Sequence, residues 1–141
     1  MFKISVVGAE SFEIAPECTK SVRFTTDIPL DSNARTKDVG TTMIIKGKIL
    51  AAVDGDPFDS TRQLAMWSAV PAEQANCYRN VTVENIRGGI IERNYNFPNA
   101  FVVDYVENFG DVEGVGEFTL TMRQKKDKIE KVTIQGGYVG E

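Results

Sequence analysis

A strict alternation of apolar and polar residues is the sequence feature that most limits what this chain can fold into. In GEFTLTMRQ, which begins at Gly116, the apolar residues Phe118, Leu120 and Met122 are separated by polar ones. Successive side chains of a β-strand point to opposite faces, so a repeat of two places one row in a core and the other in water. The segment therefore predicts a strand with one buried face.

The same repeat of two recurs along the chain and predicts a mainly β protein. It appears in SVRFTTDI, TMIIKGKI and KVTIQG, and shorter apolar runs predict further strands. These further strands are expected at Phe2–Val7, Cys77–Ile86, Ile90–Asn94 and Ala100–Val106. A length of 141 residues predicts one domain over residues 1–141, large enough to bury a core.

One segment departs from the alternation and predicts a helix. In STRQLAMWSAV, Ser60 precedes Gln63 by three residues, the spacing of a capping box at a helix N-terminus. Leu64 and Trp67 then share one face, and Pro71 ends the helix after about three turns. We expect Leu64 and Trp67 to pack the helix onto the sheet.

A long polar segment, Pro29 to Gly40, separates two predicted strands. It is longer than a hairpin turn, and connections of that length within a small domain are usually functional or ordered by a partner. Its polar and charged residues are the candidates for such contacts: Asp31, Asn33, Arg35, Lys37 and Asp38.

Composition excludes several classes of function. The chain has no histidine, which removes His-based nucleophile pairs and imidazole metal sites. Cys18 and Cys77 are the only cysteines and form no metal-binding spacing, so they are expected to be buried thiols. The net charge of −4 does not suggest a nucleic-acid partner. The chain has no apolar run that would span a membrane and begins without a signal-peptide pattern, so cytoplasmic synthesis is expected.

The strongest candidates for catalysis are the carboxylates Asp111, Glu113 and Glu117, which lie among three glycines. A pair of carboxylates performs glycoside hydrolysis when one of them is held protonated in an apolar pocket. Nothing apolar in this stretch would enclose them, so a solvated turn is the expected structure.

Two further patterns also have a structural interpretation. The acidic run from Asp54 to Ser60 is similar to a calcium loop, but Asp59 and Ala65 occupy the positions where that loop needs glycine and glutamate. Gly88 and Gly89 lack the residues of a phosphate loop and predict a hairpin turn. Aromatic side chains form either a ligand platform or core pairs, and they are Tyr95, Phe97, Phe101, Tyr105 and Phe109.

The order of these segments resembles the tail-tube proteins of contractile injection systems. This group includes the haemolysin-coregulated tube protein of type VI secretion, phage tail tubes and the tubes of phage-like bacteriocins. The similarity covers residues 60 to 136 through a fixed order of four segments, and residues 20 to 50 fit the earlier hairpin. The four segments are STRQLAMWSAV, YRNVTVENI, NYNFPNAFVVDYVENFGDVEGVGEFTLTMRQ and KVTIQG.

The resemblance implies a small antiparallel β-barrel or two-sheet sandwich with one α-helix, which assembles into hexameric rings that stack into a tube. It implies no catalysis, no cofactor and no membrane insertion. The implied partners are copies of the chain, sheath and baseplate or spike proteins, and a protein or DNA cargo in the channel. The tube would assemble in the cytoplasm and be ejected with the particle. The segment Pro29–Gly40 would reach the adjacent ring, with Arg35, Lys37 and Asp38 as contacts.

Three alternatives remain open at this point. A monomeric β-barrel would bind a small apolar ligand between helix and sheet, with Trp67 in the pocket wall. A baseplate adaptor would share the tube fold. A carboxylate-based hydrolase would need Glu113 or Glu117. The sequence does not distinguish phage, secretion and bacteriocin systems.

Overall fold

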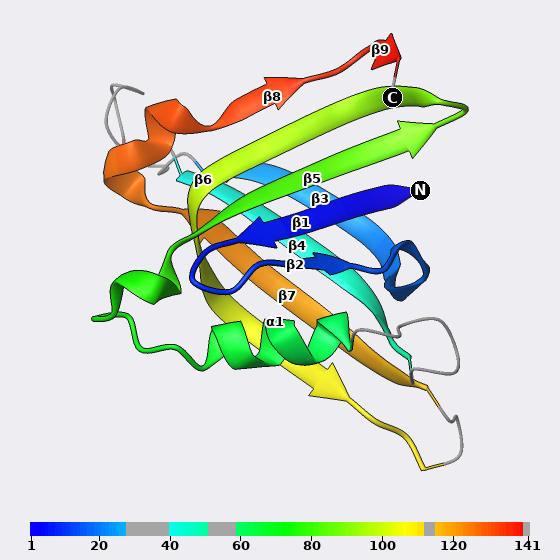
Figure 1. The fold of residues 1–141 in the computed structure, drawn as a ribbon, viewed down its shortest axis with the longest axis vertical. Helices are drawn as coiled ribbons and strands as arrows, with labels where there is room; N and C mark the ends of the chain where they lie inside the picture. Colours follow the sequence, from blue (N-terminus) through cyan, green and yellow to red (C-terminus); the bar gives the residue numbers. More distant parts are fainter. Residues whose placement is uncertain (28–39, 51–58, 112–114, 140–141) are drawn as a thin grey trace.

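The computed structural model describes residues 1–27, 40–50, 59–111 and 115–139. These residues form a curled antiparallel sheet of nine strands with one α-helix, α1 (Ser60–Ser68), and three short 3-10 helices (Figure 1). The 3-10 helices are Pro16–Cys18, Ala75–Cys77 and Lys126–Lys131. The strands are β1 (Phe2–Val7), β2 (Phe12–Ile14), β3 (Thr19–Asp27), β4 (Gly40–Ile49), β5 (Arg79–Arg87), β6 (Ile90–Asn108), β7 (Gly116–Gln124), β8 (Thr133–Gln135) and β9 (Tyr138–Val139).

Strand β6 joins two halves of the sheet. The hydrogen-bonded order is β2-β1-β5-β6-β7-β4-β3, with β8 and β9 also paired to β6. The first half of β6 pairs with β5, and from Ala100 onward β6 pairs with β7. The halves pack face to face, since Phe24 of β3 stacks on Tyr95 of β6 with 4.9 Å between ring centroids. The predicted mainly β antiparallel fold with one helix is confirmed, in the form of a sandwich that shares β6.

The alternating residues form the core between the two halves. Phe118, Leu120 and Met122 are each 1% exposed, and the polar residues between them lie on the opposite face of β7. Cross-strand partners continue the same buried layer, because Leu120 pairs with Ile45 of β4. Burying each such side chain contributes about 1.5–3 kcal/mol. Cys18 and Cys77 are buried, and no disulfide joins them.

The continuity of β6 differs from the prediction of two separate strands, Ile90–Asn94 and Ala100–Val106. The residues left between the two predicted strands include Pro98, which has no N–H to give to the ladder. The structure accommodates Pro98 because the pairing with β5 shifts register between Phe97 and Ala100. The neighbouring Asn99 N–H instead donates to the Gln124 side-chain oxygen at 2.9 Å. Strand β6 therefore continues through the proline.

One other predicted boundary was wrong, and one strand residue expected in the core is exposed. Cys77 belongs to a 3-10 helix, and β5 begins at Arg79 rather than at Cys77. The apolar residue Ile134 of β8 is 49% exposed, because β8 pairs with β6 at the margin of the sheet rather than over the core.

Helix α1 begins at the predicted residue but without the predicted capping box. The N-cap is Asp59, which has a left-handed φ of 51° and makes no capping hydrogen bond through its side chain. The Ser60 hydroxyl instead accepts a hydrogen bond from the Ala15 N–H at 3.3 Å, which ties the helix to the end of β2. The helix ends at Ser68, earlier than predicted, and its buried residues include Leu64 and Trp67.

Gly47 of β4 lies where another backbone segment crosses the strand at very short range. A Cβ at this position would overlap the Cys18 carbonyl oxygen and lie 2.6 Å from the Phe118 ring. We expect Gly47→Ala to lower the free energy of unfolding by about 1–3 kcal/mol, because neither neighbour has room to move. Urea denaturation measures this, with Lys48→Ala as the control at the next, exposed position. Equal unfolding midpoints for the two variants would contradict the expectation.

Candidate assembly surface

The second half of the sheet, β6-β7-β4-β3, has two long edges. In the part of the chain that the structure describes, β3 pairs only with β4. Residues 101–108 of β6 pair with β7 on one side, while β5, β8 and β9 all pair with the earlier part of β6. A strand edge presents unpaired N–H and C=O groups that bind another strand readily. Both edges are therefore available to strands of another chain.

The directions of the strands at these edges are complementary. All three pairings in β6-β7-β4-β3 are antiparallel, so β6 and β3 run in opposite directions. If the β3 edge of one copy met the β6 edge of a second copy, the new pair would also be antiparallel. Each further copy would repeat the same relation, so one sheet would continue through many chains. A head-to-tail contact of this kind closes into a ring when its rotation allows.

Exposed apolar side chains follow the β6 edge. Val103 is 51% exposed, Val106 is 40% exposed and Phe109, just after the strand, is 68% exposed. Val103 is the extra residue where the register with β7 shifts, between Val102 and Asp104. Three exposed apolar side chains within residues 103–109 favour an interaction surface at this edge. The sequence carried a signal for this bulge, because the two adjacent valines interrupt the alternation.

The chain leaves this half of the sheet at two opposite ends. At one end Asp27 pairs with Gly40, and the segment 28–39 connects them. At the other end Asn108 pairs with Glu117, which also pairs with Lys48. The predicted contact residues of the long polar segment lie outside the described residues: Asp31, Asn33, Arg35, Lys37 and Asp38. The positions of Asp27 and Gly40 show that the segment starts and finishes at the end remote from Phe109.

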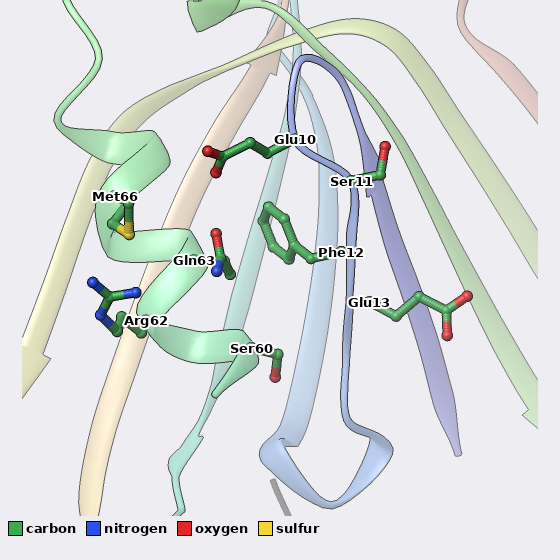
Figure 2. Close-up of a pocket in the computed structure, with 8 residues that line it drawn as sticks. All are labelled: Glu10, Ser11, Phe12, Glu13, Ser60, Arg62, Gln63 and Met66. Atoms are coloured by element: carbon green, nitrogen blue, oxygen red, sulfur yellow. The ribbon is translucent and has the colours of Figure 1, made fainter. Parts of the chain in front are cut away.

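The third edge of the sheet, at β2, faces a groove beside α1 (Figure 2). The groove has a volume of about 690 Å³, and Glu10 and Phe12 form one wall while Arg62 and Met66 form the other. Trp67 does not line it. The hydrogen bond from Ala15 to Ser60 closes one end of the β2 edge. The groove is therefore less accessible to a long strand than the β3 and β6 edges are.

Of the three carboxylates weighed as candidates for catalysis, the two that the structure describes, Asp111 and Glu117, do not lie in an enclosed site. Glu113 lies outside the described residues, and Asp111 is exposed. The Glu117 side chain is 61% exposed, and its Oε1 accepts a hydrogen bond from Lys20 Nζ at 2.8 Å. The Lys20 ammonium lowers the pKa of the Glu117 carboxyl through the hydrogen bond and its charge. A general acid needs a raised pKa, so this arrangement does not provide one.

The Lys20–Glu117 ion pair leads to a testable prediction about the pKa of the Glu117 carboxyl. We expect the Glu117 carboxyl to titrate below the reference pKa of about 4.3, and Lys20→Gln to return it toward that reference. Because the folded pKa is depressed, the contribution of the pair to stability is present above the unfolded pKa. It is lost as the pH falls through the folded pKa. NMR titration of the carboxyl measures this, and an unchanged midpoint in Lys20→Gln would contradict it.

The described aromatic residues form separate pairs, some of them in the core, rather than one platform. Tyr105 stacks on Phe118, and Phe101 packs edge-on against Tyr78. Phe97 is 1% exposed. Burial raises the pKa of Tyr105, whose hydroxyl donates to Glu107 Oε1 at 2.8 Å. Of the predicted platform residues, Phe109 alone is largely exposed, and it belongs to the apolar β6 edge.

The cavity beside Trp67 is too small for a ligand-binding site. It has a volume of about 50 Å³ and is lined by residues that include Trp67, Cys77 and Phe101. Pockets for small ligands measure about 300–1,000 Å³. The Trp67 ring is 1% exposed, and its Nε1–H donates to the Cys77 carbonyl oxygen at 2.9 Å. Trp67 thus acts as a packing residue in this structure.

The remaining candidates have structural explanations or lie outside the described part. Gly88 and Gly89 have φ values of 59° and 78° and form the predicted hairpin turn between β5 and β6. Asp54 and Asp56 lie outside the described residues. Among the side chains that the structure describes, no group of three His, Cys, Asp or Glu is placed to hold a metal ion. Within the same residues, no helix has the length and apolar character needed to cross a membrane.

Comparisons with known proteins identify similar structures. No protein-family model matches the sequence, and no curated protein matches it. The fold is similar to a chain in the six-fold-symmetrised structure of the anti-feeding prophage baseplate, with a TM-score of 0.58, 13% identity and coverage of 96% of this chain and 92% of that one.

Two structures of Hcp1 proteins are also similar. Hcp1 from Flavobacterium johnsoniae matches with a TM-score of 0.54 and 17% identity over 99% of both chains. A variant of Hcp1 from E. coli EAEC 042 matches with a TM-score of 0.55 and 11% identity, covering 96% of this chain and 97% of that chain. The chain thus has an Hcp-like tail-tube fold over nearly its whole length, as the resemblance implied.

Proposed function

We propose that this protein is the inner-tube subunit of a contractile injection system and assembles into hexameric rings that stack around a channel. The observation that carries the proposal is the pair of complementary strand edges on an Hcp-like fold. The β3 and β6 edges are long and lie on opposite sides of the four-stranded half-sheet β6-β7-β4-β3, and their strands run in opposite directions. Ring formation would remove both edges from water, which is how closed sheets avoid uncontrolled pairing.

In this proposal the two ends of the half-sheet serve stacking. The segment 28–39 starts beside Asp27 and Gly40, while Phe109 and Val115 lie at the other end of the same strands. Copies stacked along the strand direction would bring the segment of one ring toward the opposite end of the next. Asp31, Asn33, Arg35, Lys37 and Asp38 are the proposed polar contacts between rings. The tube would form in the cytoplasm within a sheath and leave the cell when the sheath contracts.

Negative-stain microscopy of the purified chain tests the proposal. Rings of uniform diameter, alone or stacked into tubes, are the expected result at high protein concentration. A sample that remains monomeric at every concentration would contradict it. Sedimentation velocity on the same samples gives the mass of the ring and therefore the number of copies.

The second candidate is a baseplate adaptor, which the similarity to a chain of the anti-feeding prophage baseplate favours. An adaptor forms one ring that binds a different protein on its next face, so its rings would not stack with one another. Single rings at concentrations where tubes are expected would favour this role. The alternative of an apolar ligand beside Trp67 loses support, because the cavity there is only about 50 Å³ in volume and the larger groove beside α1 is lined mainly by polar and charged residues. A hydrolase also loses support, because Glu117 is exposed and paired with Lys20.

A further inference from the structure

Positive charge gathers on the solvent-facing side of the strands β3, β4 and β7. By strand register, five cationic residues share this face with three acidic ones, Asp27, Asp104 and Glu117. The cationic side chains are Lys20, Arg23, Lys46, Lys48 and Arg123. We name this group, with the strands that carry it, the cationic face.

The charge of this face is opposite to that of the whole chain. The chain has 16 Lys and Arg against 20 Asp and Glu, a net charge of −4. With five of those cations and three of those acidic residues, the cationic face carries +2, which leaves −6 on the rest of the molecule. The net charge alone therefore hid a strong separation of charge, because it averages the two regions.

The cations of this face are only partly neutralised within the chain. Lys20 pairs with Glu117, but the ion pairs of the described residues leave Arg23, Lys46 and Lys48 without a carboxylate at salt-bridge distance. All three side chains are exposed. Lys46 and Lys48 are two positions apart on β4, so both point to the same side of the sheet and lie about 7 Å apart along the strand. Adjacent like charges repel one another, so a partner of opposite charge would stabilise this arrangement.

The neighbours of the cations indicate what kind of partner fits. Ile44 lies opposite Arg23 in the ladder and is partly exposed, and Val106, next to Thr119, is 40% exposed. Asp104 adds a carboxylate that would repel phosphates. Interfaces with nucleic acid are strongly positive and polar, whereas protein interfaces combine apolar contacts with complementary charges. The face therefore matches an acidic protein surface better than a duplex.

We propose that the cationic face binds the acidic surface of a protein that the assembled ring carries. The location rests on the proposed function, because this face belongs to the half-sheet β6-β7-β4-β3 that would continue through the ring. The other half of the sheet and α1 pack against the opposite side, and we place that second layer at the outside of the ring and the cationic face toward the channel. The partner is then an acidic cargo protein in the channel. Electrostatic attraction would hold the cargo protein on the cationic face without a specific pocket, and added salt would weaken that attraction.

A binding experiment with defined probes tests the inference. The probe is a negatively supercharged fluorescent protein, with its positively supercharged counterpart and a short DNA duplex for comparison. The test variant is Lys46→Gln with Lys48→Gln. Its control is Lys3→Gln with Lys131→Gln, which removes the same charge from exposed positions outside the cationic face. Fluorescence anisotropy at low and physiological salt measures binding.

We expect the wild-type chain to bind the acidic probe in a salt-dependent way and to ignore the basic one. Removing Lys46 and Lys48 should weaken binding about tenfold, as two ion pairs of about 0.7 kcal/mol each would do. The control pair should leave binding nearly unchanged. Equal weakening by both pairs, or stronger binding to DNA than to the acidic protein, would overturn the inference.

Microscopy of the same samples separates this inference from the proposed function. Rings that form normally but do not bind the acidic probe overturn the inference alone. Binding of the probe by a chain that never forms rings supports an acidic protein partner for the face, but overturns both its location in a channel and the tube proposal. Rings that are lost in the Lys46→Gln, Lys48→Gln variant would show that the face contacts another copy, which also overturns the inference.

Discussion

Replacing Val103 with lysine is expected to abolish ring formation while the monomer stays folded. Val103 is 51% exposed and lies at the bulge of β6, on the edge that would meet β3 of another copy. A lysine on an edge strand blocks pairing, because its ammonium would have to leave water without a partner. A cost of about 2.8 kcal/mol raises the concentration needed for assembly about a hundredfold.

The control for Val103→Lys is Val139→Lys. Val139 is also a valine on a strand and is 76% exposed, but β9 pairs with the other part of β6. Sedimentation velocity and negative-stain images should show monomers for Val103→Lys and rings for Val139→Lys. Circular dichroism should give similar melting temperatures for both. Rings in the Val103 variant, or their loss in both variants, would exclude the β6 edge as the specific contact.

The fold class could be predicted from local sequence because one face of each long strand is buried. The alternation in β7 gave its bounds, since Phe118, Leu120 and Met122 have to share one side and any slip would expose all three. The glycine pair before Ile90 gave the hairpin for a similarly local reason. Gly88 and Gly89 occupy positive φ values that other residues adopt at a cost.

What the sequence did not reveal depends on contacts between distant segments. The alternation predicted two strands with a gap around Pro98, but β6 continues there, and Gln124, 25 residues away from Asn99, accepts the Asn99 backbone hydrogen bond. Ser60 suggested a capping box, but its hydroxyl bonds to Ala15, 45 residues away. In each case a tertiary hydrogen bond replaced the local one that the pattern favoured.

The assembly surface depends on topology even more than on contacts. Whether a strand is central or at an edge follows from the strand order, which alternation does not encode. The segment from Phe101 to Asn108 reads as an ordinary half-buried strand, and only the order of the sheet shows that its second side has no neighbour among the described residues. Likewise, the charge separation became visible only when register placed Arg23, Lys46 and Lys48 on one face.

The stability of the subunit should depend on a part of the molecule remote from these edges. Trp67 of α1 is 1% exposed, its indole N–H donates to the Cys77 carbonyl oxygen at 2.9 Å, and the Arg79 guanidinium lies 5.5 Å from its ring centroid. The residue therefore joins the helix to the chain that enters β5. Its removal would leave a cavity and an unpaired buried carbonyl at once.

We expect Trp67→Ala to lower the free energy of unfolding by about 3–5 kcal/mol, the usual cost of removing a buried aromatic ring. Met66→Ala is the matched control in the same helix, because Met66 is 44% exposed and should change stability only slightly. Trp67→Phe separates the two contributions, since it keeps most of the packing but loses the hydrogen bond to Cys77. Urea denaturation followed by circular dichroism should rank Met66→Ala, Trp67→Phe and Trp67→Ala in order of increasing loss. Similar midpoints for the two alanine variants would mean that α1 is not held by Trp67, because the loss of a buried ring would then cost no more than the loss of an exposed side chain.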